Sequence, residues 1–443
     1  MNADRRHLDV VPRTHLREHR ERVLAWSQTR AASTIGVHPS TLWRWESGQI
    51  SVIRAYDLQM IANAYGLSYE DLDRIESRRS ARPDRTVLSW DIRGTVEAFR
   101  LLEGSGMNQH LAGLRAGDDL TGLAREWLTA PALLATAHEG SHHIDIAVVE
   151  QLESMVLRLR HLDDEIGGAD LLPVVSQRHQ RMAVLLAGTY TSAVGRRLHA
   201  AAADLGHLLG WLAFDTGQHP LAQRQWIAAL HAAHSADDPL IGANILAGLA
   251  MQAYAMNRPH DGLSLAQTAE QGLPASSSTR VRSMIACRQA VAAAKIGDAI
   301  TSGRALNRAE DLLDHDDPHI PAWLYYYGHA DEELHAGTAW LALNEPHRAE
   351  HAFQNALECI DPTHVRDRGV ILSRIALTRV AQGEIEGAAL AAQDALLLCS
   401  AQLHSLRAVD ELTDVDHALS TYFDQVPAAR DFHDHYDTLV STE

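Results

Sequence analysis

One stretch of the sequence has the residue types and spacing of a zinc hydrolase. His138-Glu139-Gly140-Ser141-His142 matches the H-E-x-x-H pattern, in which two histidines on one helix face bind zinc and the glutamate acts as a base. That chemistry needs a rigid helix, whereas the glycine and serine inside the motif both weaken one. With 27 histidines in the chain, we expect a coincidental match in a loop, with no enzymatic activity, metal or cofactor.

A second set of side chains has the chemistry for reading DNA. A guanidinium can donate two parallel hydrogen bonds to guanine, so Arg44 is the first candidate for direct base readout. The alternatives for Arg44 are a phosphate contact or an ion pair with an acid such as Glu46. The candidate DNA-binding residues are Gln28, Thr29, His38, Ser40, Thr41, Trp43 and Arg44.

The elements that must hold these residues follow a helix-turn-helix pattern. Gly36 can adopt the positive φ that ends a helix, and Pro39 suits the first turn of the next one. Leu42 and Trp45 lie three residues apart, so they should face the core while their neighbours line the groove. Helices are predicted over residues 13–26, 28–35, 40–46 and 55–65, followed by a capped fifth turn over 67–72.

The string Gly36-Val37-His38-Pro39-Ser40-Thr41-Leu42-Trp43-Arg44-Trp45-Glu46-Ser47-Gly48 resembles the xenobiotic-response-element family of helix-turn-helix regulators. The resemblance implies that Gln28 contacts a phosphate and that residues around the Ser/Thr pair read bases. Pro39 departs from the family pattern because it cannot hydrogen-bond a base edge, and Trp43 is large where a small polar residue is common. No base preference therefore carries over.

Charge is divided unevenly along the chain, whose net charge is -18. Residues 1–90 carry 14 arginines and 11 acids, net +3, whereas residues 91–443 carry 25 basic and 46 acidic residues, net -21. An acidic body would repel DNA and leave a modest basic head to approach it. We therefore expect salt-sensitive binding of double-stranded DNA by a homodimer on a two-part site.

Composition excludes several other classes. At 443 residues and 46% apolar residues, the chain is long enough for more than one domain and a large core. No apolar run approaches the roughly 20 residues of a membrane span, so we expect a cytoplasmic protein with no membrane partner. Cys287, Cys359 and Cys399 have no paired spacing and are predicted to be buried core residues.

The C-terminal region carries an internal repeat. Turn-forming residues occur at Gly217, Asn257, Gly297, Asn344 and Gly383, at spacings of 40, 40, 47 and 39. Each is followed twelve residues later by alanine, and small residues stand five after and seven before it. Small residues on both sides of a turn let two helices approach closely, and stacked hairpins bury one continuous core. The pattern predicts a solenoid of helix hairpins.

These offsets resemble the tetratricopeptide repeat, although the spacing exceeds the usual 34 residues. The aromatic position of the repeat is kept at Trp226 and Phe353. We therefore expect an all-α chain, a five-helix helix-turn-helix domain followed by a tetratricopeptide-like α-solenoid. The expected divisions are an N-terminal tail (1–12), the DNA-binding domain (13–75), a linker with connector helices (76–118), and the sensor and oligomerisation domain (119–443).

The combination of such a head and body resembles actinobacterial regulators and, more distantly, quorum-sensing receptors that hold a peptide in a repeat superhelix. It implies a peptide or small-molecule effector on the concave face, made by the first helix of each hairpin. Asn244 could hydrogen-bond a peptide backbone, and Trp211 and Tyr254 could supply apolar contacts with a polar edge. The candidate effector-binding residues are His207, Trp211, Phe214, Asn244, Met251, Tyr254, Met284 and Asp331.

A different class of function remains open. The acidic solenoid could instead be a scaffold for a partner protein, with the head serving only to tether it to DNA. Operator sequence, effector identity and the sign of regulation are not encoded in any motif found.

Overall fold

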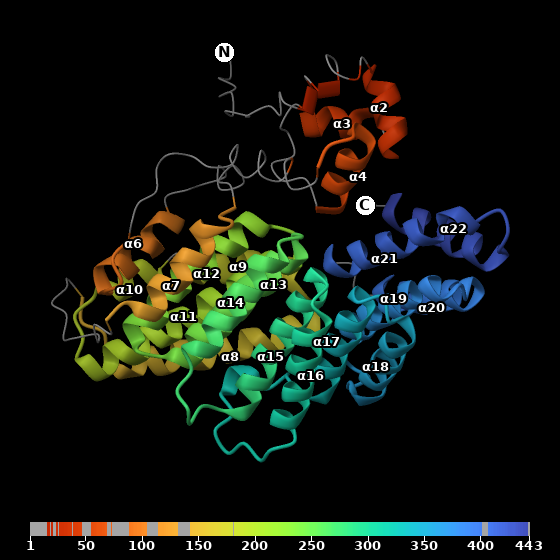
Figure 1. Cartoon of the computed structure of the whole chain (residues 1–443). Helices are drawn as coiled ribbons and strands as arrows, with labels where there is room; N and C mark the ends of the chain where they lie inside the picture. The colour runs from red at the N-terminus through yellow and green to blue at the C-terminus, as the bar shows by residue number, and fades with distance from the viewer. Residues whose placement is uncertain are drawn as a thin grey trace, which may run out of the picture. The chain divides into compact units, whose positions relative to one another are not determined.

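The computed structural model describes residues 16–17, 19–20, 24, 26–37, 39–46, 55–68, 72, 88–103, 114–131, 142–179, 181–400 and 406–441. The chain divides into two compact units. The first comprises Met1–Val87, Gly104–Ala116 and Ala255–Asn257, and the second comprises Leu88–Glu103, Gly117–Tyr254 and Arg258–Glu443. Helices make up the regular structure of the described residues (Figure 1). The predicted all-α class is confirmed.

The first unit contains helices α2 (Gln28–Ile35), α3 (Pro39–Glu46) and α4 (Ala55–Tyr65). Ser27 caps α2, since its side chain accepts a hydrogen bond from the backbone N–H of Arg30. Gly36 then ends α2 in the left-handed conformation, with φ of 88°. The core of this unit comprises Leu16, Ala31, Ala32, Ile35, Leu42, Trp45, Leu58, Ile61, Ala62, Tyr65 and Leu72.

The helix predicted over 13–26 ends earlier than expected. Leu16 and Arg17 are helical, but Leu24 and Trp26 lie outside any helix. The backbone N–H of Trp26 donates to the carbonyl of Arg20 at 2.9 Å, and the Trp26 ring packs edge-on against Tyr65. Packing of the half-buried Trp26 ring against Tyr65 therefore overrides the local helix pattern.

The second unit begins with a helix that the sequence placed in the connector, α6 (Ile92–Glu103). It packs against α10 (Met182–Leu186) and α12 (His219–Ala236). The Thr95 hydroxyl of α6 donates to the carbonyl of His231 at 3.0 Å and lies 2.9 Å from the Ser235 hydroxyl. The apolar face of α6 is thus part of the body's core. The early helices are α6 (Ile92–Glu103), α7 (Asp118–Thr129), α8 (Ile146–Ile166), α9 (Gly168–His179) and α10 (Met182–Leu186).

Five helix hairpins follow, as the repeat predicts. They are α11 (Ser192–Asp215) with α12 (His219–Ala236), α13 (Pro239–Ala255) with α14 (Pro259–Gln271), α15 (Thr279–Ile296) with α16 (Ala299–Leu313), α17 (His329–Ala342) with α18 (Pro346–Cys359), and α19 (Val365–Gln382) with α20 (Ile385–Ser400). A 3-10 turn, η3 (Ala322–Leu324), precedes α17. Helices α21 (Leu406–Leu419) and α22 (Pro427–Ser441) end the described chain.

The five hairpin turns share one backbone device. Each predicted turn residue has positive φ, between 58° and 88°. In each turn the next residue's N–H donates to the carbonyl five positions earlier, for example Gln218 to Ala213 at 2.7 Å and Glu384 to Arg379 at 2.9 Å. This bond satisfies a carbonyl that the helix end leaves open. Glycine and asparagine recur because they tolerate the left-handed conformation.

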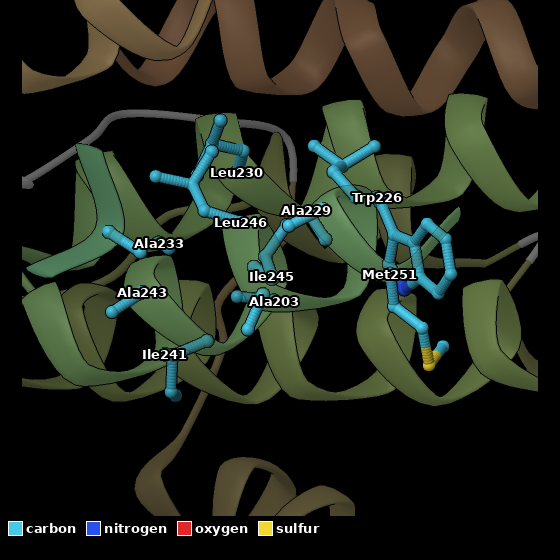
Figure 2. Close-up of a cluster of buried hydrophobic side chains, with 14 of the residues drawn as sticks. Ala203, Trp226, Ala229, Leu230, Ala233, Ile241, Ala243, Ile245, Leu246 and Met251 are labelled. Carbon is cyan, nitrogen blue, oxygen red and sulfur yellow. The ribbon is translucent and has the colours of Figure 1, made fainter. Parts of the chain in front are cut away.

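Small residues let the paired helices approach closely. The five predicted alanines, from Ala229 to Ala395, are all fully buried. A Cβ built on Gly210 would lie 2.4 Å from the Trp226 ring nitrogen, so only glycine leaves room for that ring. Figure 2 shows the buried cluster around Trp226, in which α12 side chains such as Leu230 gather with Ile245 of α13.

We expect Gly210→Ala to lower the free energy of unfolding by about 1–3 kcal/mol, because the new methyl group must displace the enclosed Trp226 ring. Gly303→Ala is the matched control: a Cβ there meets nothing within 4 Å, so alanine should stabilise α16 by about 0.5–1 kcal/mol. Urea titrations followed by circular dichroism measure both. Equal stabilities for the two variants would contradict the packing described.

Within the second unit, polar contacts join helices that lie far apart in the sequence. Arg366, at the start of α19, lies 3.4 Å from the Asp163 carboxylate near the end of α8 and 3.6 Å from that of Asp215 at the end of α11. The Tyr325 hydroxyl also donates to Asp164. We call Asp163, Asp164, Asp215, Tyr325 and Arg366 the clasp.

The described cysteines differ in their exposure to solvent. Cys287 is buried as expected, but Cys359 is exposed because it ends α18 at the surface; the side chain of Cys399 lies outside the description. Among the described helices, none combines the length and apolar character needed to cross a membrane.

Candidate DNA-binding site

A buried ion pair anchors α3 in the first unit. Arg20 donates from Nε to Oε1 of Glu46 at 2.6 Å and from Nη2 to Oε2 at 2.8 Å. Its Nη1 also donates to the Trp26 carbonyl at 3.1 Å. Both charged side chains are about 95% buried, with exposed fractions of 6% and 4%. The two parallel bonds fix the end of α3 relative to the preceding segment.

The same carboxylate also fixes the start of α2. Gln28 donates from Nε2 to Oε2 of Glu46 at 3.4 Å. Gln28 is half-buried at the first position of α2, and Thr29 beside it is exposed. The free N–H groups of a helix N-terminus favour a phosphate at this point. The arrangement therefore suits a phosphate contact by this end of α2, as the family resemblance implies for Gln28.

Helix α3 divides into a buried and an outer face. Leu42 and Trp45 are buried, with 0% and 3% of their surface exposed, which confirms their predicted place in the core. Thr41 is half-buried. At 100° per residue, the positions of Ser40 and Arg44 lie on the face opposite Leu42. The side chains of Ser40, Trp43 and Arg44, and His38 as a whole, lie outside the described residues.

The sequence pattern did not indicate the Arg20–Glu46 pair. It offered Glu46 as a partner for Arg44, whereas both oxygens of Glu46 accept from Arg20. A helix-turn-helix that carries an arginine position on the outer face of its second helix has the arrangement that DNA recognition needs. Residues 13–88 match the family model described as a helix-turn-helix domain.

The first unit carries a helix-turn-helix domain. This domain supports a role as a DNA-binding regulator. No curated protein matches the chain significantly. The linker expected within 76–118 lies, up to Val87, outside the described residues.

The candidate effector residues are mostly enclosed in the second unit. Asn244, Met251, Tyr254 and Met284 are buried, as are His207 and Phe214, while Trp211 and Asp331 are partly exposed. Among the described residues, no group hydrogen-bonds to the Asn244 amide. The Trp211 ring nitrogen donates to the Asp163 carboxylate at 3.1 Å and so belongs beside the clasp.

Several of these residues meet around two arginines, Arg160 and Arg288. Arg160 of α8 is paired with Asp204 and lies 3.2 Å from Nδ1 of His207. Arg288 of α15 donates to the Tyr254 hydroxyl at 3.3 Å. Burial, followed by the nearby guanidinium groups of Arg160 and Arg288, holds the pKa of His207 well below its usual range. Arg288 follows Met284 by one helical turn, so the same spacing that selected Met284 could have found it.

The zinc-hydrolase motif is only partly described. His142 is exposed, while His138 and Glu139 lie outside the described residues. Within the described residues, no group of three or more histidine, cysteine, aspartate or glutamate side chains could hold a metal ion.

Buried neutral histidines should make the body acid-sensitive. Burial lowers the pKa of His179 to about 4, its ring stacks on Phe99, and none of the described residues hydrogen-bonds to its Nε2. An unfolded histidine titrates near 6.5, so the unfolded state binds more protons between these values, and stability falls as pH drops from about 6.5 to 4.

We expect His179→Phe to remove about 2–3 kcal/mol of this pH dependence, because phenylalanine keeps the stack and cannot be protonated. Urea unfolding at pH 7, 5.5 and 4.5 measures the difference. His347→Gln, which removes an exposed imidazole from α18, is the control. An unchanged pH dependence in His179→Phe would show that this ring is protonated in the folded state.

Proposed function

We propose that the protein is a sequence-specific transcriptional regulator that reads DNA through α3. The observation that carries this proposal is the α2–α3 helix-turn-helix. Burial of Leu42 and Trp45 and the Arg20–Glu46 pair fix the orientation of α3. These contacts leave the positions of Ser40 and Arg44 on the outer face. The net charge of +3 over residues 1–90 supports approach to a polyanion.

The proposal includes sensing by the second unit. A curved array of tetratricopeptide-like hairpins offers an inner surface made by the first helix of each pair, and such surfaces suit peptides or small molecules. The meeting of His207, Tyr254 and Met284 near two arginines supports a binding role there. A homodimer that binds a two-part site would add the affinity that one modest basic head lacks.

The deciding experiment selects genomic fragments with full-length protein and measures binding of the selected sequences by fluorescence anisotropy at several salt concentrations. A shared two-part sequence should bind far more tightly than random DNA. Arg44→Ala should weaken that binding by about 1–3 kcal/mol, the contribution of one bidentate guanine contact. Arg44→Lys is the matched variant, since it keeps the charge and loses the bidentate geometry.

The outcomes separate the readings. If Arg44→Lys binds the selected sequence as tightly as the wild type does, Arg44 contacts phosphate only. If no sequence is enriched, specific regulation is wrong for the protein alone, and the alternative of an acidic scaffold for a partner protein is favoured by the net charge of -21 over residues 91–443.

A further inference from the structure

Arg288 is a half-buried cation of the second unit, and its partners among the described residues are neutral. Its Nη1 donates to the Tyr254 hydroxyl at 3.3 Å and to Nε2 of His335. His335 donates from Nδ1 to the Asp331 carbonyl at 2.5 Å, so its Nε2 must be the acceptor and the ring is neutral. Within the described part of the chain, no carboxylate lies within ion-pair distance of Arg288.

The neighbouring arginines on the inner helices are neutralised. Arg160 pairs with Asp204, and Arg374 pairs with Glu411 at 2.6 Å. The Arg288 Nε is enclosed, and none of the described residues accepts a hydrogen bond from it or from Nη2. A largely enclosed charge without an acidic partner is costly to keep in a folded protein. A ligand group that completes its bonds would remove that cost.

The side chains around Arg288 are partly exposed to solvent, although protein atoms desolvate their polar groups. Tyr326, whose hydroxyl lies 3.8 Å from Sδ of Met284, has 38% of its surface exposed, yet desolvation raises its pKa. Lys295, two helical turns after Arg288 on α15, is exposed, yet desolvation lowers its pKa. Solvent-accessible groups that are nonetheless surrounded by protein are what a recessed binding surface presents.

We propose that Arg288 binds an oxyanion, the carboxylate or phosphate group of an effector, at a recessed site formed with Tyr254, Tyr326 and His335. A planar guanidinium suits both groups, and the phenols contribute apolar surface with a polar edge. Lys295 lies two helical turns further along the same face of α15, where Arg374 and Glu411 both act on its charge. The proposal names the chemistry of the effector and therefore rests on the sensing role proposed above.

The test is calorimetric titration of the full-length protein with inorganic phosphate, citrate, and two pentapeptides of one sequence that end in a free carboxylate or an amide. At least one anionic probe should bind the wild type. Arg288→Gln should weaken that binding about tenfold or more, the loss expected for a charged hydrogen bond. Arg282→Gln is the matched control, since Arg282 lies on the same helix and its guanidinium donates to the Pro274 carbonyl.

The probes distinguish the sources of the anion. Binding of phosphate or citrate points to a small metabolite, whereas binding of the free-acid peptide but not its amide points to a peptide C-terminus. Equal binding by Arg288→Gln, or no saturable binding of any anionic probe by the wild type, overturns the proposal. So does a ligand-free melting temperature that is far lower in Arg288→Gln than in Arg282→Gln, because Arg288 would then be structural.

Lys295 provides an independent readout because it is the only lysine in the chain. An amine-reactive ester should acylate it more slowly when the bound probe covers it, as followed by mass spectrometry against an added lysine derivative. The operator affinity, measured in parallel, separates the two proposals. If an anion binds at Arg288 without changing that affinity, the site stands and the sensing role fails.

Discussion

Arg20→Ala is expected to unfold the helix-turn-helix domain and abolish DNA binding. It removes the partner of a carboxylate that is 4% exposed and leaves Glu46 as an uncompensated buried charge. Breaking a buried pair in this way costs about 3–5 kcal/mol. That is a large fraction of the stability of a small domain. Hydrogen exchange of the α2, α3 and α4 amides in the full chain measures the loss directly.

The double variant Arg20→Met with Glu46→Leu separates charge from structure. Because both charges leave together, the domain should recover most of its protection from exchange. Gln28 would then lose the carboxylate that it bonds, so its contribution to DNA binding can be measured in a folded domain. Full protection in the single variant Arg20→Ala would show that the pair does not hold α3.

Arg366→Leu should be the most damaging single change in the second unit. It leaves the carboxylates of Asp163 and Asp215, which are 5% and 0% exposed, without their cation. We expect a loss of about 3–5 kcal/mol at pH 8. Burial already raises the pKa of Asp163, and Arg366 opposes that rise.

The pH dependence provides the check on this assignment. Without Arg366, the folded protein should hold a proton on Asp163 to higher pH than the unfolded chain does, so the variant regains stability as pH falls toward 5. Urea unfolding at pH 8 and pH 5 measures this difference. Arg197→Leu, which removes an exposed guanidinium paired with Glu153, should leave stability unchanged at both values. A loss that is equal at pH 8 and pH 5 would contradict the clasp.

Local patterns predicted the parts of this fold that are locally determined. The turn residues from Gly217 to Gly383 and the buried faces at Leu42 and Trp45 follow from backbone conformation and helical spacing, which are properties of neighbouring residues. The bounds of α2 and α4 were predicted correctly for the same reason.

The long-range polar contacts were not predictable in this way. Arg366 lies 203 positions from Asp163, and Arg20 lies 26 positions from Glu46. Nothing in the spacing of these charges distinguishes them from the many other arginines and acids of the chain. The sequence placed α6 in a connector because the helices that cover its apolar face, α10 and α12, follow much later in the chain. Arg288 could have been found from the sequence in part, because it lies one helical turn after the predicted residue Met284 on the same face of α15.

The clasp changes the physical character of the helical array. A linear stack of hairpins behaves as a one-dimensional chain, in which the terminal units can fray while the rest remains folded. Here an ion pair joins the end of α8 to the start of α19, so the helices between them are held at both ends. Unfolding of any hairpin between α8 and α19 must therefore strain or break the contacts of the clasp. Destabilisation of one hairpin should therefore affect the others, and the segment from α8 to α19 should unfold in a single cooperative transition.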